Sequence, residues 1–106
     1  MDVWNNNVRF AVLVNNEASF ITAFTTIIPY NRITIDYSIS RNGVYRNGVI
    51  SAAVTGSTIV WSDDYNQTGD TGVVLNLTSS GSLVTVQYTT TNTSYDATLN
   101  YSITTI

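Results

Sequence analysis

The sequence contains no cysteine, no histidine and no lysine. Without cysteine the chain has no disulfide framework, no thiol nucleophile and no zinc-thiolate site. Without histidine it lacks the side chain whose ordinary pKa suits proton transfer near neutral pH, and without lysine it lacks the amine that forms Schiff bases. Seven carboxylates, four arginines and the hydroxyl groups remain for chemistry. We therefore expect no enzymatic activity, no cofactor and no resident metal.

Charge is also scarce, because charged residues make up 10% of the chain, against about 25% in typical soluble domains. The net charge is −3, and four arginines are too few to neutralise a phosphate backbone, which excludes nucleic acid as a partner. No apolar run approaches the roughly 18 residues of a membrane span, so we expect no membrane insertion. Threonine, serine and asparagine fill the polar positions, and such a neutral, hydroxylated surface favours a particle or an extracellular setting over the cytosol.

Apolar and polar residues alternate along most of the chain, which predicts β-strands. The clearest strand is residues 32–40. One face carries the apolar side chains of Ile33, Ile35, Tyr37 and Ile39, and the other carries Thr34, Asp36 and Ser38. Further strands are predicted at residues 8–14, 20–28, 49–54, 58–61, 73–78, 84–89 and 97–104. Residues 62–70 are the one long polar stretch and are predicted to form a loop. The sequence therefore predicts a single all-β domain over residues 1–106, an antiparallel β-sandwich or jelly roll of about eight strands.

Two Arg-Asn-Gly triplets begin at Arg41 and Arg46. Asn-Gly is the strongest short signal for a hairpin, because both residues tolerate a positive φ. One triplet is predicted to form a hairpin turn and the other a β-bulge. We interpret both arginines as solvated charges beside these turns, with a clamp for a carbohydrate or a carboxylate as the alternative.

Three predicted strands, residues 8–14, 20–28 and 49–54, are apolar on both faces. A strand in a two-layer sandwich needs only one apolar face, because the other meets water. An interface between copies of the chain is the simplest way to bury the second face, since a large exposed apolar patch is a liability. We therefore expect a homo-oligomer, with an interface that includes Phe10, Val12, Val14, Phe20, Phe24, Ile28, Ile50 and Val54.

The polar stretch at residues 62–70, together with the tryptophan before it, is the candidate binding site. Two aromatic rings there offer flat apolar faces to a sugar, and their polar neighbours offer hydrogen bonds, so the predicted glycan site comprises Trp61, Asp63, Asp64, Tyr65 and Asn66. A calcium site at Asp63, Asp64 and Asp70 stays open as an alternative, although Leu75 stands where an EF-hand loop needs a glutamate. A catalytic carboxylate pair is excluded, because Asp63 and Asp64 are adjacent and point to opposite sides of an extended chain.

Two segments carry a resemblance to a known group of proteins: residues 56–77, GSTIVWSDDYNQTGDTGVVLNL, and residues 84–103, VTVQYTTTNTSYDATLNYSI. They resemble the C-terminal domains of phage virion appendage proteins, the trimeric fibre, collar and knob modules, some of which have a jelly-roll fold similar to tumour necrosis factor. The resemblance covers about residues 32–106. It implies a trimeric phage structural protein and carries no binding residue over to this chain. Residues 1–7, with Trp4 and Asn5 to Asn7, would then be an arm for attachment to the rest of a fibre or to a capsid.

These observations predict a non-enzymatic structural protein located in a virion. It would be a homotrimer that forms the head of a tail fibre or appendage, or a capsid decoration (cement) protein. Its expected partners are copies of itself, other virion proteins and a host-surface glycan. The alternative is a free-standing carbohydrate-binding module, which would be monomeric and would lose sugar binding on Trp61→Ala.

Overall fold

The computed structural model describes residues 8–29 and 31–105, which form eight strands and no helix. The strands are β1 (Arg9–Leu13), β2 (Ile21–Ile27), β3 (Arg32–Arg41), β4 (Val44–Thr55), β5 (Thr58–Gln67), β6 (Val73–Ser80), β7 (Leu83–Thr90) and β8 (Ala97–Thr105). The predicted all-β class and the number of strands are confirmed. The predicted attachment arm, with Trp4 and Asn5 to Asn7, lies outside the described residues.

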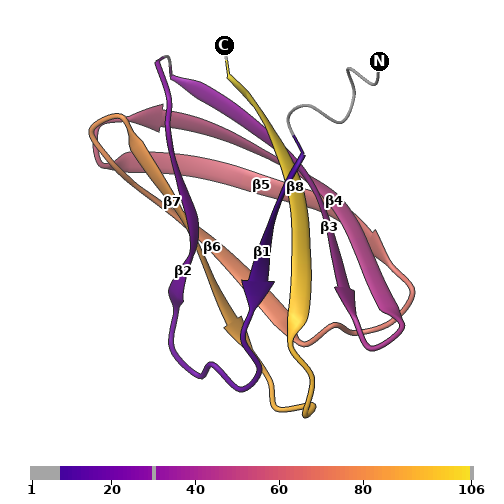
Figure 1. Cartoon of the computed structure of the whole chain (residues 1–106). Helices are drawn as coiled ribbons and strands as arrows, with labels where there is room; N and C mark the ends of the chain where they lie inside the picture. The colour runs from indigo at the N-terminus through magenta and orange to yellow at the C-terminus, as the bar shows by residue number, and fades with distance from the viewer. Residues whose placement is uncertain (1–7, 30, 106) are drawn as a thin grey trace.

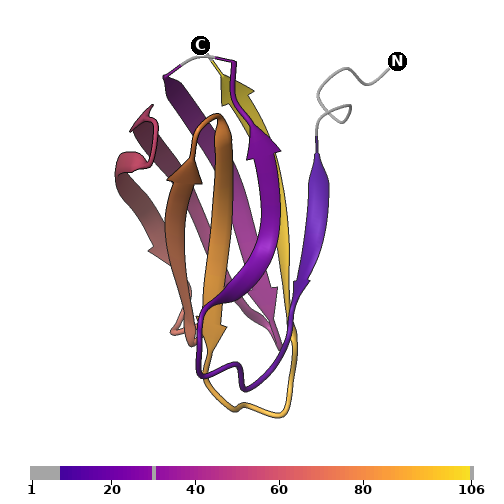
Figure 2. The same cartoon turned by 90° about the vertical axis from the view of Figure 1, so that its left-hand side faces the viewer.

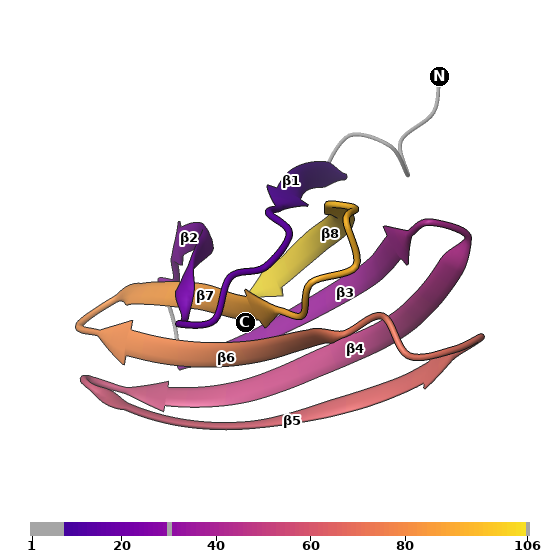
Figure 3. The same cartoon turned by 90° about the horizontal axis from the view of Figure 1, so that it is seen from below.

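The strands form two antiparallel sheets packed face to face (Figures 1 and 3). The larger sheet has the order β1-β8-β3-β4-β5, and the smaller has the order β2-β7-β6. Strands β3, β4 and β5 are successive hairpins, whereas β8 lies between β1 and β3, and β7 lies between β2 and β6. Pairing of early strands with late ones is the Greek-key arrangement found in jelly rolls. Figure 2 shows the smaller sheet in front of the larger one, with β1 at one margin.

Alternate residues of both sheets fill the space between them. Leu99 of β8, Ile39 of β3 and Val86 of β7 are at most 1% exposed, and each lies on the strand face that the alternation predicts to be apolar. Phe24 of β2 stacks on Tyr101 of β8, with ring centroids 3.8 Å apart and an interplanar angle of 6°. This stack joins the two sheets beside β1.

The polar stretch at residues 62–70, which was predicted to be a loop, is largely strand. Strand β5 continues to Gln67 and pairs with β4 without interruption, from Thr58 opposite Thr55 to Gln67 opposite Arg46. Polar residues extend this strand because β5 is an edge of the sheet, where its side chains after Asp63 meet solvent. The connection between β5 and β6 is therefore short, at residues 68–72.

The two Arg-Asn-Gly triplets have different roles. The first forms the β3–β4 hairpin, where Asn42 and Gly43 have φ angles of 46° and 82°, so the hairpin prediction is confirmed. The predicted bulge at the second triplet is wrong, because β3 and β4 pair in continuous register along the whole of β3. Gly48 lies within this ladder, opposite Tyr37.

Candidate functional site

The residues predicted to bind a glycan all lie on β5, which divides them between two faces of the larger sheet. Trp61, Asp63 and Tyr65 pair with residues of β4 on the inner face, toward the smaller sheet, whereas Asp64 and Asn66 are on the outer face. The predicted platform of two rings beside three polar side chains is therefore wrong, because successive side chains of a strand point in opposite directions. The same alternation confirms that Asp63 and Asp64 cannot act as a carboxylate pair.

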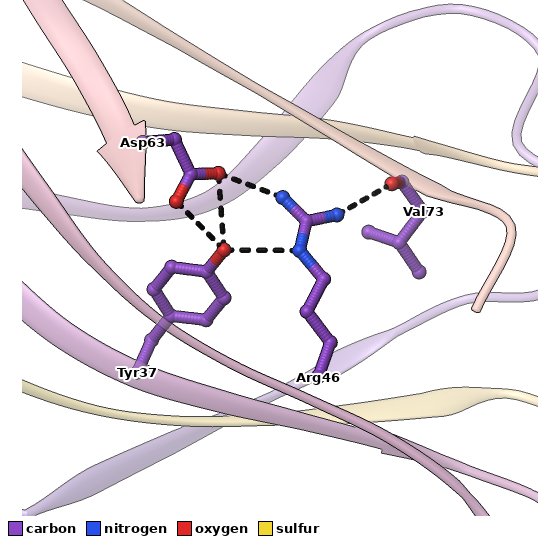
Figure 4. A network of polar contacts seen from close by, with 4 residues as sticks. All are labelled: Tyr37, Arg46, Asp63 and Val73. Atoms are coloured by element: carbon purple, nitrogen blue, oxygen red, sulfur yellow. Dashed lines mark hydrogen bonds and ion pairs between the residues drawn. The ribbon is translucent and has the colours of Figure 1, made fainter. Parts of the chain in front are cut away.

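Asp63 belongs to a polar network on the inner face (Figure 4). The Tyr37 hydroxyl donates to both carboxylate oxygens of Asp63, at 2.9 and 3.0 Å. Arg46 donates from Nε to the Tyr37 hydroxyl oxygen at 3.0 Å, from Nη2 to Asp63 Oδ2 at 2.7 Å and from Nη1 to the Val73 carbonyl oxygen at 3.0 Å. The guanidinium also lies 3.9 Å from the centroid of the Tyr65 ring. Asp63 is thus bound inside the protein and is not a glycan ligand.

Gly48 makes this network possible. Tyr37 is on β3 and Asp63 is on β5, so the tyrosine ring has to pass over β4 to reach the carboxylate. A Cβ atom built at Gly48 would lie 2.7 to 2.8 Å from three atoms of the Tyr37 side chain, closer than a Cβ atom approaches another side chain in proteins. Glycine is present here because the space that a side chain would occupy is filled by the ring.

Burial raises the pKa of the Tyr37 hydroxyl well above its ordinary value of 10.0, and its hydrogen bond to Asp63 raises the pKa further. The hydroxyl therefore keeps its proton at neutral pH and acts as a donor to Asp63, so it cannot serve as a general base there. Arg46 is 6% exposed, and its donors are met by protein groups. The network is a structural support that holds β3, β4, β5 and the start of β6 together.

A second polar network is centred on Arg41 at the end of β3. Its Nε donates to the Tyr95 carbonyl oxygen at 2.9 Å, and Nη1 donates to the Thr71 carbonyl oxygen at 2.8 Å. Its Nη2 donates to Asn15 Oδ1 at 2.7 Å and to the Thr91 carbonyl oxygen at 2.6 Å. One guanidinium thus joins the three connections β1–β2, β5–β6 and β7–β8 at one end of the sandwich (Figure 1).

The interpretation of Arg41 and Arg46 as solvated turn charges is wrong, because they are 4% and 6% exposed. The alternation of apolar and polar residues in the sequence indicated that both arginine side chains point inward. Alternate positions of β3 face inward, and Arg41 occupies one of them, as Ile33, Ile35 and Ile39 do. Arg46 likewise occupies an inward-facing position of β4. Tyr37, which the alternation had assigned to the apolar face, is confirmed there, but its polar partners are distant in the sequence and were missed.

The predicted interface residues divide into two groups. Ile28, Ile50 and Val54 are at most 3% exposed and belong to the core of the chain, so their assignment to an interface is wrong. In the predicted strand 49–54, Ile50, Ala52 and Val54 face inward, and Val49 and Ala53 are the apolar residues that face outward. Phe24 is half-buried in its stack on Tyr101.

The other group is exposed and lies mostly on β1. Phe10 is 69% exposed, and Val8, Val12 and Val14 are between 44% and 51% exposed. Phe10 and Val12 lie opposite Asn100 and Thr98 of β8 on the outer face of the larger sheet. We call Val8, Phe10, Val12 and Val14 the β1 row. Phe20, in the connection after β1, is 46% exposed.

The outer face of β3, β4 and β5 carries short polar side chains around Val49. In register across the three strands lie Asp36, Val49 and Asp64, and the next row contains Asn47 and Asn66. These five residues line a shallow open depression of about 590 Å³ above Gly48. Asp64 and Asn66 of the predicted glycan site are therefore brought together with residues that the sequence had not singled out.

In the part of the chain that the structure describes, no group of three or more Asp, Glu, His or Cys side chains is placed to hold a metal ion. Among the same residues there is no helix with the length and apolar character needed to cross a membrane. No family model, curated protein or solved structure matches this chain.

Proposed function

We propose that this chain is a non-enzymatic structural protein that self-associates through β1, as a homotrimer in a phage virion. The observation that carries the proposal is the β1 row, because it places four exposed apolar side chains on and directly beside a strand at the edge of a sheet. Edge strands of stable monomers are normally protected by charge, proline or a covering segment. Among residues 8–29 and 31–105, no such segment covers the outward side chains of β1.

The size of the β1 row is compatible with an interface between copies. The β1 row offers an apolar patch on the order of a few hundred Å², the size at which exposed patches mark interaction sites. At about 25 cal/mol per Å², burying such a patch contributes roughly 5–10 kcal/mol per copy. Association costs roughly 4–15 kcal/mol in lost rotation and translation. Backbone groups on the open side of β1, which faces away from β8, supply further hydrogen bonds.

The two polar networks support a structural function over an enzymatic one. Tyr37, Arg46 and Asp63 bind one another, and Arg41 binds backbone and amide oxygens. Every buried side-chain nitrogen and oxygen in the described residues has a hydrogen-bond partner. Groups that are matched in this way stabilise the fold and leave no buried donor or acceptor for a substrate.

The trimer and the virion rest on the sequence resemblance and on the low charge of the surface. A trimer would place the β1 rows of three copies around one axis, with a fibre head or a capsid decoration protein as the assembled form. Other virion proteins would then be the further partners. Mass spectrometry of virus particles from cells that carry the gene tests this location, and absence of the chain from the particles overturns it.

Light scattering across a dilution series tests self-association directly. The wild type is expected at three times the chain mass of 11.6 kDa. Phe10→Lys is expected to shift the mass to one chain, because a lysine at the centre of the β1 row would be buried without a partner. Val60→Lys is the matched control, since Val60 is also 69% exposed but lies on β5 at the opposite edge of the sheet.

The control variant should keep the wild-type mass, and circular dichroism should show the same fold for all three proteins. A wild-type monomer at every concentration would refute self-association. A stable dimer would refute the trimer, and equal effects of the two lysines would refute β1 as the interface.

A further inference from the structure

The outer face of β4 and β5 carries two neighbouring depressions. The first, described above, lies over Gly48. The second has a volume of about 390 Å³, and the outward residues that line it are Arg32, Ser51, Ala53, Val60 and Ser62. The rows of paired residues that line them are consecutive along the ladder: Asn47 with Asn66, Val49 with Asp64, Ser51 with Ser62 and Ala53 with Val60. Together they form one elongated surface along β4, which we call the β4 face.

The dimensions of the first depression follow from sheet geometry. Asp36 and Asp64 lie one strand away from Val49 on either side, so their strands are about 10 Å apart. The row of Asn47 and Asn66 lies about 7 Å farther along the strands. Two carboxylates and two amides thus surround an apolar side chain over an area that one pyranose ring fills.

The four polar side chains are free to bind a ligand. Within residues 8–29 and 31–105, the side chains of Asp36, Asn47, Asp64 and Asn66 make no hydrogen bond to the protein. The asparagines that stabilise the fold differ, because Asn15, Asn31 and Asn76 each bond to another part of the chain.

The arrangement also decides which class of ligand fits. A cation lacks a full set of ligands here, because Val49 lies between Asp36 and Asp64 and, in the described residues, no third acidic side chain is grouped with them. An anion is repelled by the same two carboxylates. A neutral saccharide is suited to the face, because carboxylates accept from its hydroxyls, amides both donate and accept, and Val49 contacts its C–H groups.

We propose that the β4 face binds a neutral linear saccharide lying along β4. One sugar ring rests on Val49 between Asp36 and Asp64, and the saccharide continues past Ser51 and Ser62 toward Ala53 and Val60. Tyr45 lies at the opposite end of the β4 face from Ala53. Its side chain also points outward from β4, is 52% exposed and offers an aromatic face. The site is independent of self-association, because β1 and β5 are opposite edges of the sheet.

The experiment is a titration of the whole chain with cellohexaose, maltohexaose and N-acetylchitohexaose, followed by amide NMR spectra. At least one of these neutral probes is expected to shift the amide signals of residues 45–53 and 60–66. Asp36→Ala and Asp64→Ala should each weaken binding about tenfold or more, as expected for the loss of a hydrogen bond to a charged group. Thr78→Ala, on the exposed outer face of β6, is the matched control and should bind as the wild type does.

Three results would overturn the proposal. The first is that none of the three probes shifts any amide signal at millimolar concentration. The second is that the shifts fall outside β4 and β5, or that both aspartate variants bind as tightly as Thr78→Ala. The third is that a lysine-rich peptide shifts the same signals at lower concentration than any sugar, which would make the face a contact for a basic protein. The spectra report the fold of each variant, and the oligomer mass is measured separately, so failure here leaves the self-association test intact.

Discussion

At the scale of single residues, the most informative position is a glycine that the sequence assigned to a turn or bulge. Gly48 lies in a regular ladder, and its φ does not require glycine. The ring of Tyr37 crosses the backbone at this point to reach Asp63. One missing side chain on β4 therefore permits a hydrogen bond between β3 and β5.

Gly48→Ala should destabilise the chain by about 2–4 kcal/mol, because the added methyl group displaces the ring and breaks its bond to Asp63. Urea unfolding measures the change. Gly69→Ala is the matched control, since its Cβ would lie at an ordinary 3.4 Å from Val44, and it should change the stability by less than about 1 kcal/mol.

A double-mutant cycle separates two contributions to the cost of Gly48→Ala, the displacement of the Tyr37 ring and the effect of the added methyl group on the backbone. In a Tyr37→Ala background the ring is absent, so Gly48→Ala should cost much less than in the wild type. Additive costs would show that the ring is not the reason for the glycine.

Sequence alternation identified which side chains of β3 point inward, but not what they contact. That Asp63 and Asp64 point opposite ways needs only the period of two. The partners of Asp63 are 26 and 17 residues away, and their approach depends on the strand order. Arg41 and Arg46 were assigned to solvent because their neighbours in sequence are turn residues, although both occupy inward-facing positions of their strands.

At the scale of elements, the strands are well predicted because each needs only a local alternation. The extent of β5 was missed, because strand β4, which is 12 residues long, determines how far its neighbour stays paired. The β1 row and the β4 face also depend on the strand order of the larger sheet, which places β1 at one edge and β5 at the other. Residues of the β1 row are exposed because β1 is an edge, whereas equally apolar residues of β4 are buried.

The three connections that meet at Arg41 depend on the shape of its guanidinium. Arg41→Lys keeps the charge but replaces a planar fork of five donors with three donors on one nitrogen. Arg41 contacts four oxygens, on Asn15, Thr71, Thr91 and Tyr95. At least one of them would then lose its donor, which should destabilise the chain by about 2–4 kcal/mol in urea unfolding.

Arg32→Lys provides the comparison, because Arg32 is exposed at the start of the same strand. It should change the stability by no more than about 0.5 kcal/mol. If the two variants unfold at the same urea concentration, the geometry of Arg41 does not hold the connections.

At the scale of the whole molecule, the raised pKa of Tyr37 makes stability depend on alkaline pH. The unfolded chain loses this proton near pH 10.0, whereas the folded chain retains it. Stability from this group is complete below pH 10 and is lost as the pH rises above 10, by up to about 1.4 kcal/mol per pH unit.

Urea unfolding of the wild type and Tyr37→Phe between pH 8 and pH 11.5 measures this effect. The difference in stability between the two proteins should be constant below pH 10 and should shrink above it, because phenylalanine has no proton to lose. A constant difference over the whole range would show that the Tyr37 hydroxyl ionises equally in both states.

The positions of β1 and β5 at opposite edges of one sheet have a consequence for how firmly the protein holds a surface. In the proposed trimer, closed symmetry would place the β4 faces of the three copies at equal heights along the symmetry axis. A saccharide-coated surface would then meet three of the proposed sites at once, and each bound site would raise the effective concentration of the sugar at the other two. Avidity of this kind exceeds the affinity of one site by roughly a hundredfold or more. In the proposed assembly, a weak contact on a small, nearly uncharged sandwich would be sufficient for durable attachment.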